Sequence, residues 1–265
     1  MATTETRPPF GPAFDGWASY NEFETSVESD LRYVRSKASE QFLAEVRASC
    51  ARRRLVIPQK KIFWRARLGC EYEQVTNTHP DITVVHDEDR PYKQEGMKPI
   101  PNWQGEGRAN PRGIPFLYLA TTRDTALAEV RPWLGVTISV AQLQVERDLH
   151  VIDCSKHHSR DSILGIFEDH TKTKEDGIWF AIDRAFATPV SKEDEARDYI
   201  PTQIIAELFK SEGYDGIVYK SLLSDDGFNI ALFNLDDANV IYCALFKMDS
   251  ISFGFKETGT EYFVK

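Results

Sequence analysis

The sequence predicts a single α+β domain with a mixed sheet, preceded by an amino-terminal helical extension. Short apolar runs typical of strands alternate with segments of helical periodicity, no internal repeat occurs, and the elements follow no strict β-α-β order. A chain of 265 residues can bury a sizeable core without metal or disulfide staples. We expect the extension to span residues 1–58 and the main domain to span residues 59–265.

The extension combines a loose arm with a helical region. Residues 1–17 are rich in Thr, Pro and Gly, which predicts an irregular arm. From Tyr20 to Arg54 there is no proline or glycine, and apolar residues recur every three or four positions. These positions are Phe23, Val27, Leu31, Val34, Ala38, Phe42 and Val46. Their apolar face must pack on the main domain or on a second subunit, and the sequence leaves both arrangements open.

Residues 55–58 and 61–67 predict the first strand of the main domain. In the second segment Phe63, Arg65 and Arg67 share one face of the strand. Two arginines on an otherwise apolar strand are costly to bury unless they meet anions or the domain edge. A structural salt bridge and an anion clamp both account for them.

The rest of the main domain is predicted from its periodicity. Residues 69–107 are polar with little periodicity, so we expect a long loop that could cover a site. Residues 135–145 predict a strand, with 149–153 as its antiparallel partner. Later elements are helices near 161–170, 176–187 and from Thr202 to Gly213, then strands at 217–222 and 230–233.

The stretch from Gly107 to Pro132 carries the densest chemistry. Its apolar run Phe116–Ala120 has no polar alternation, which predicts a strand buried on both faces with Tyr118 projecting from it. Thr and Asp residues then favour a helix that begins near Thr122 and ends before the proline.

Within this short helix the spacing places Glu129 beside the buried stripe, next to the small Ala126. A carboxylate at that position faces the edge of a cleft. An exposed glutamate paired with an arginine is the alternative interpretation.

Composition excludes several classes of function. The net charge of −9 argues against nucleic-acid binding, which requires a basic face. No apolar stretch is long enough to span a membrane and the amino terminus lacks a signal peptide, so we expect a cytoplasmic protein, with export by a signal-independent route left open. The cysteines are scattered, and His157, His158 and His170 lack further ligands at helical spacing, so we expect no metal site.

Three polar residues, Arg65, Glu129 and Ser221, stand out in otherwise apolar elements, and each lies in a motif. The motifs are Trp64-Arg65-Ala66-Arg67, then the Gly107–Gly113 turn with Leu117–Ala120 and Ala126–Glu129, and finally Gly213–Ser221. Together they resemble the motifs of the RES family of NAD-consuming enzymes, many of which are toxins of bacterial toxin-antitoxin pairs. The resemblance covers roughly residues 60–235.

The resemblance implies a fold similar to ADP-ribosyltransferase toxins and cleavage of the nicotinamide-ribose bond of NAD. It implies Glu129 as the catalytic carboxylate, Arg65 and Arg108 as phosphate contacts, and Tyr118 and Ser221 as contacts to the nicotinamide-ribose end, with Arg67 as the alternative to Arg65. NAD would be a substrate and no prosthetic group is expected. One carboxylate suffices, because nicotinamide leaves as a neutral group and needs no general acid.

The acceptor stays open at this point. Inorganic phosphate would make the protein an NAD phosphorylase, water a glycohydrolase, and a protein side chain an ADP-ribosyltransferase that docks its target through residues 69–107. The expected macromolecular contact is an antitoxin protein or self-association through the helical extension.

Two other classes of protein compete with this one. A serine hydrolase built on Ser221 is disfavoured, because Lys220 and Leu222 replace the glycines of a nucleophile elbow. A non-catalytic interaction protein that works through its helical extension is the second.

Overall fold

A computed structural model describes residues 18–79, 82–100, 105–156, 174–188 and 196–252, together with 254 and 259. Its main feature is an eight-stranded sheet in the order β1-β7-β8-β9-β5-β2-β6-β10, in which only β7 and β8 run parallel. The strands are β1 (Arg54–Ile57), β2 (Ile62–Leu68), β5 (Leu117–Ala120), β6 (Thr137–Val145), β7 (Leu149–Asp153), β8 (Gly216–Lys220), β9 (Phe228–Leu232) and β10 (Ala238–Lys247). The predicted α+β class with a mixed sheet is confirmed. The likeness to ADP-ribosyltransferases stays a prediction.

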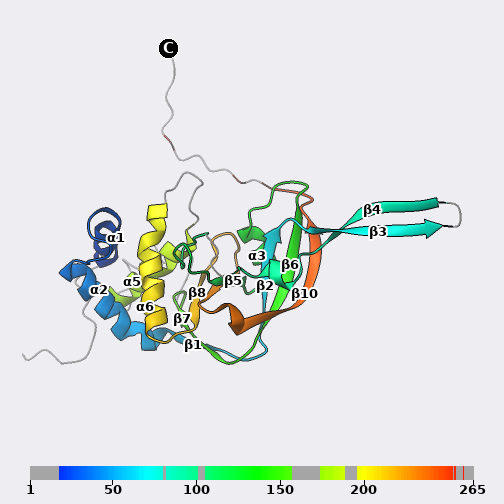
Figure 1. Cartoon of the computed structure of the whole chain (residues 1–265). Coiled ribbons are helices and arrows are strands. Elements are labelled where there is room, and N and C mark those ends of the chain that lie inside the picture. The colour runs from blue at the N-terminus through cyan, green and yellow to red at the C-terminus, as the bar shows by residue number, and fades with distance from the viewer. Residues whose placement is uncertain are drawn as a thin grey trace, which may run out of the picture.

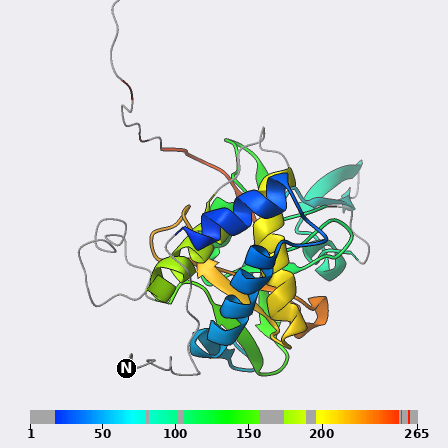
Figure 2. The same cartoon turned by 90° about the vertical axis from the view of Figure 1, so that its left-hand side faces the viewer.

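Helices cover one face of the sheet, as Figures 1 and 2 show. They are α1 (Ser19–Ser29), α2 (Lys37–Ser49), α5 (Lys174–Ala187) and α6 (Ile200–Ser211). A core cluster joins Trp179 and Phe209 of these helices to the sheet, and a second cluster on the other face includes Phe63 and Leu143. Strand β5 lies between the two clusters and is buried on both faces, as predicted.

The amino-terminal helices pack on α5 and α6 of the same chain, which decides between the two arrangements left open above. The ring of Phe23 stacks on that of Phe42 with centroids 4.7 Å apart. The helical region expected from Tyr20 to Arg54 consists of two helices, because the chain turns after α1 and Ser36 caps α2 by accepting the amide of Ser39 at 3.1 Å. Leu31 and Val34 lie in this turn and are exposed rather than part of a buried stripe.

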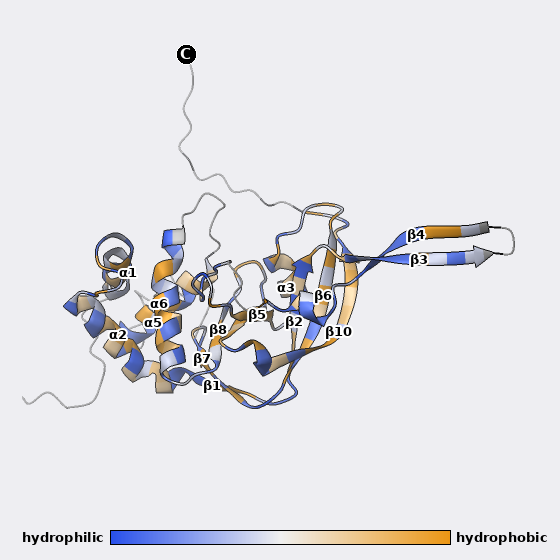
Figure 3. Ribbon diagram, in the orientation of Figure 1, coloured by the Kyte–Doolittle hydropathy of each residue, from blue (hydrophilic) through white to orange (hydrophobic). Residues whose placement is uncertain are grey.

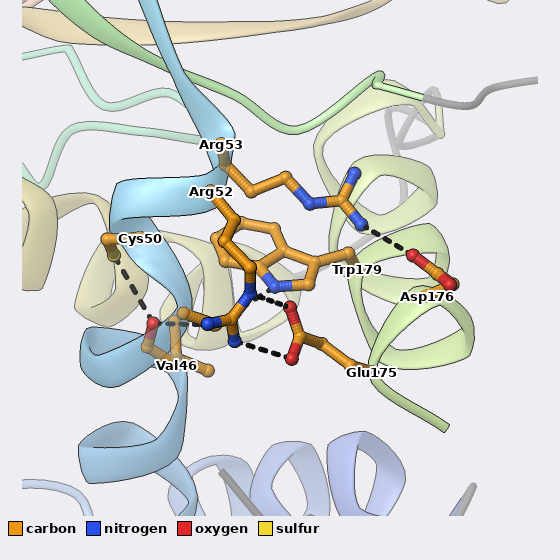
Figure 4. Close-up of polar contacts among 8 residues, drawn as sticks. Val46, Cys50, Arg52, Arg53, Glu175, Asp176 and Trp179 are labelled. Atoms are coloured by element: carbon orange, nitrogen blue, oxygen red, sulfur yellow. Dashed lines mark hydrogen bonds and ion pairs between the residues drawn. The ribbon is translucent and has the colours of Figure 1, made fainter. Parts of the chain in front are cut away.

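Two arginines fasten this region to α5 (Figure 4). Arg52 donates two hydrogen bonds to Glu175, at 2.9 and 2.6 Å. Arg53 is buried, lies over the ring of Trp179 at 5.1 Å and forms an ion pair with Asp176 at 3.3 Å. Strand β1 follows at once and pairs with β7, so a strand of the main sheet lies before the predicted boundary at residue 58. As a domain division that boundary stays a prediction.

The long loop expected at 69–107 is wrong. Strands β3 (Glu71–His79) and β4 (Ile82–Arg90) form a separate two-stranded hairpin that projects away from the rest of the molecule (Figure 1). A 3-10 helix, Gln94–Met97, then returns to the body, where Met97 is buried. The sequence of the hairpin lacks the apolar and polar alternation of a half-buried strand, because side chains are exposed on both of its faces.

The expected pairing of 135–145 with 149–153 is also wrong. Strand β6 pairs with β2 and β10, whereas β7 pairs with β1 and β8. Between them Arg147 binds Asp215 at 2.7 Å and Asp237 at 2.9 Å, and the amide of His150 donates to Asp215 at 2.7 Å. These contacts direct β7 toward β8.

Helices α5 and α6 confirm their predictions. In α5 Ile178, Ile182 and Phe186 face the core, and α6 ends before Gly213, whose φ of +84° is the left-handed conformation expected of a helix-terminating glycine. The helix expected near 161–170 lies outside the described residues. No helix within the described part of the chain combines the length and apolarity needed to cross a bilayer.

We predict that Phe23→Ala lowers the free energy of unfolding by about 3–5 kcal/mol, because it removes a ring that is 2% exposed and leaves a cavity between α1 and α2. Denaturant unfolding measures the loss. The matched control is Tyr33→Ala, in the adjoining turn, where the ring is 89% exposed and the change should stay within about 0.5 kcal/mol. Equal effects of the two substitutions would contradict the packing of the extension on this core.

Candidate functional site

A cavity of about 320 Å³ opens where the sheet is weakest. Strands β2 and β5 share a single register pair, Trp64 with Ala120. Beyond this pair the strands diverge, and Arg65 and Ala66 of β2 face Leu119 and Tyr118 of β5 across the gap. The full lining is Trp64, Arg65, Ala66, Gly107, Arg108, Tyr118, Leu119, Ala120, Ala126, Glu129, Val130, Tyr199, Tyr219 and Asn229.

Glu129 reaches this cavity from the end of a short helix, α3 (Arg123–Glu129). The helix begins as predicted, with Thr122 as the cap that accepts the amide of Thr125 at 3.1 Å. At its other end the Oε1 atom of Glu129 accepts two hydrogen bonds of 2.7 Å, one from the hydroxyl of Ser221 and one from the Nδ2 amide of Asn229. Glu129 is exposed, as the alternative interpretation expected, but among the described residues a hydroxyl and an amide hold its carboxylate in place of an arginine.

Ser221 and Asn229 are only 1% and 7% exposed. Ser221 follows β8 and Asn229 lies in β9, so adjacent strands supply the two donors. Ser221 contacts the carboxylate without lining the cavity. Together the donors fix one oxygen of Glu129 from within the protein.

Arg65 projects from β2 into the same cavity. Its Nη1 atom donates to the backbone carbonyl of Tyr118 at 2.8 Å, and its buried Nε atom has no hydrogen-bond partner in the described structure. Burial, and to a smaller extent the charge of Arg67, lowers the pKa of Arg65 to about 10. The side chain thus stays a cation at neutral pH, with a buried donor that a bound anion would satisfy.

The turn that carries Arg108 is locked to β5 by Tyr118. The hydroxyl of Tyr118 donates to Oδ1 of Asn110 at 2.7 Å and accepts the amide of Ala109 at 3.1 Å. Position 107 requires glycine, because a Cβ atom there would lie 2.6 Å from the Tyr118 hydroxyl. Burial raises the pKa of Tyr118, so its hydroxyl keeps its proton and this bond.

Arg108 lines the cavity and donates to the backbone carbonyl of Phe186. Arg67, the alternative to Arg65, does not reach the cavity. It is exposed, lies over the ring of Tyr92 at 4.4 Å and donates to the carbonyl of Gly96. The structure therefore brings Arg65, Arg108, Tyr118 and Glu129 together, with Ser221 behind the carboxylate.

Sequence reasoning missed Asn229. It precedes the strand predicted at 230–233, yet it is a buried amide inside the apolar strand β9. A polar side chain flanked by Phe228 and Ile230 was the signal that could have identified it.

The described residues contain no ligand set for a metal ion. Among the described residues no group of three or more His, Cys, Asp or Glu side chains could hold a metal ion. His157, His158 and His170 lie outside the described residues.

Comparisons with known proteins bear on the fold and the family. The crystal structure of the M.tuberculosis MbcT-MbcA toxin-antitoxin complex is similar over 77% of this chain and 92% of that chain, at 12% sequence identity and a TM-score of 0.38. A likeness of this size carries no functional argument. No curated protein matches the chain in sequence.

The model of the RES domain family matches residues 82–251, which contain Arg108, Glu129 and Ser221 but not Arg65. The match confirms the family to which the three motifs pointed. Because it spans more than half of the sequence, this chain belongs to the RES domain family.

Proposed function

We propose that the protein consumes NAD by cleaving its nicotinamide-ribose bond. The observation that carries the proposal is the Glu129 carboxylate, which lines a cavity while Ser221 and Asn229 hold one of its oxygens at 2.7 Å. A carboxylate fixed in this way is ready to stabilise positive charge that develops beside it. The RES motifs around Glu129 support NAD as the substrate whose ribosyl group carries that charge.

In the proposed reaction the bond between C1 of the ribose and the ring nitrogen of nicotinamide breaks. Both electrons of this bond leave with nicotinamide, which becomes neutral, and the ribosyl group becomes oxocarbenium-like. The Oε2 atom of Glu129 accepts neither of the two bonds that anchor the side chain. We assign this oxygen to the cationic carbon or to the attacking acceptor.

Arg65 and Arg108 are the proposed contacts to the pyrophosphate. Arg65 keeps a buried Nε donor without a partner, and an arginine fork matches phosphate oxygens in a bidentate manner. A cavity of about 320 Å³ lies at the small end of ligand pockets, so we expect it to hold the nicotinamide-ribose end while the adenosine extends outward.

The geometry changes two of the roles that the resemblance implies. The hydroxyl of Tyr118 is already bound to Asn110 and Ala109, so its ring rather than its hydroxyl is offered to the ligand. Ser221 acts on Glu129 and positions it. Water and inorganic phosphate both remain acceptors of the ribosyl group, and nicotinamide release with and without added phosphate separates a glycohydrolase from a phosphorylase.

We predict that Glu129→Gln lowers the turnover of NAD by roughly two to four orders of magnitude, because the amide keeps the shape and removes the charge. Release of nicotinamide at saturating NAD measures the effect. Glu207→Gln, on the exposed face of α6, is the matched control and should leave turnover unchanged. Near-normal turnover in Glu129→Gln would refute the mechanism.

For Arg65→Ala we expect affinity for NAD to fall by about 10- to 100-fold, the scale of one lost charge-assisted hydrogen bond. Calorimetry in a Glu129→Gln background measures binding without consumption of the ligand. Arg67→Ala removes the same charge from the same strand outside the cavity, so it is the control. A larger loss for Arg67→Ala than for Arg65→Ala would assign the phosphate contact to Arg67.

We also propose that the protein is a growth-arresting toxin that an antitoxin restrains, because many RES proteins have this role. Induced expression in bacteria should deplete cellular NAD and stop growth, while expression of Glu129→Gln to the same level should do neither. Growth arrest by both proteins would separate toxicity from NAD cleavage. Normal growth with normal NAD levels would rule toxicity out.

A further inference from the structure

We propose that the β3–β4 hairpin of one copy of this chain docks on the free edge of β1, and on the apolar pocket beside it, in a second copy. The proposal is independent of the enzymatic activity. It rests on two complementary features at different ends of the molecule, one acidic and one basic, each with an exposed strand edge.

The hairpin lacks support from the rest of the described structure. Its nine-residue strands extend roughly 30 Å, and they form a sheet of two strands that pairs with no other strand described. An isolated two-stranded hairpin is at best marginally stable in water. A contact along its faces or edges would supply the missing stabilisation.

One face of the hairpin has the character of a binding surface. The register pairs Tyr72 with Asp89 and Thr76 with Val85, so the side chains of these residues share a face with that of Asp87. The ring of Tyr72 is 73% exposed, and Val85 is exposed as well. The face is therefore partly apolar and its charges are acidic. Figure 3 shows the apolar stretch on β4.

The proposed receptor lies at the end of the main sheet. Within the described residues β1 pairs only with β7, so its other edge is free, and Leu55 and Val56 on it are exposed. An adjoining pocket of about 310 Å³ is mostly apolar. Its lining comprises Leu55, Val56, Ile57, Pro58, Lys61, Phe63, Thr121, Asp153, Ser155, Val218, Phe228 and Ile230. An exposed apolar edge strand is a site for the addition of another strand.

Charge complementarity selects the occupant. The charged residues of the lining are Lys61 and Asp153, and the Asp153 carboxylate accepts hydrogen bonds from the amide and hydroxyl of Ser155. Lys60 precedes Lys61, both lysines are exposed, and they match Asp87 and Asp89 on the hairpin face. A strand with acidic neighbours is thus favoured at this edge, and the hairpin is such a strand.

The hairpin that docks must come from another molecule. It leaves the body at the end opposite the helices and points away from β1 (Figure 1). A two-fold axis would let each copy insert its hairpin on the β1 edge of the other, which makes two equivalent contacts in one closed dimer.

Light scattering coupled to size-exclusion chromatography tests the proposal on the full chain. The wild type should be a dimer that weakens at high salt, because exposed charges are screened. A receptor variant, Lys60→Glu with Lys61→Glu, and a hairpin variant, Asp87→Lys with Asp89→Lys, should each weaken the dimer at least about tenfold through like-charge contacts.

A mixture of the two variants is the decisive measurement. A receptor-variant copy brings an acidic hairpin and an acidic edge, while a hairpin-variant copy brings a basic hairpin and a basic edge, so both contacts of a mixed dimer join opposite charges. Equimolar mixing should restore the dimer. Unchanged thermal unfolding of each variant monomer controls for the fold, since these residues are on the surface.

Three results would overturn the proposal. They are a monomeric wild type, a variant that dimerises like the wild type, and a mixture of variants that stays monomeric.

Discussion

The separation of β2 from β5 is the constraint on which the cavity depends. Strands that diverge after one register pair leave backbone groups that the sheet ladder no longer satisfies. Arg65 replaces part of that ladder, because its guanidinium binds the carbonyl of Tyr118 across the gap. The same side chain then keeps a buried donor for a ligand. The gap, the cation and the ligand cavity thus have one structural cause.

The position of Glu129 depends on a second feature, the close packing of α3 against the β8–β9 region. The loop between these strands approaches α3 so closely that a Cβ atom at Gly227 would lie 1.8 Å from the hydroxyl of Thr125. The same hydroxyl donates to Ser224 at 3.0 Å. Since α3 carries Glu129 at its end and β8–β9 carry its two donors, this packing sets the position of the carboxylate. A shift of the helix would break both hydrogen bonds together.

Local features of the fold were predictable from the sequence, and its long-range partners were not. The buried strand β5, the Thr122 cap and the glycine after α6 depend on neighbours within a few residues. Periodicity cannot identify which strand pairs with which, and the pairing of β7 depends on ion pairs between residues far apart in sequence. Arg65, Arg108, Tyr118 and Glu129 were found through motifs, whereas Asn229 acts through a contact 100 positions away in the chain.

Burying the cation of Arg65 opposes stability, and the layout shows how the chain tolerates it. The Arg65 side chain has no carboxylate partner among the described residues, and such burial is normally unfavourable. The helical layer, with its stacked aromatic rings and the Arg53–Trp179 contact, supplies apolar burial on the same face of β5 and β8 from which Tyr118 and Tyr219 line the cavity. The stability that this apolar burial provides offsets the cost of a site whose hydrogen-bond donors are in place before a ligand binds. The amino-terminal helices therefore pack on the same core cluster that borders the candidate site.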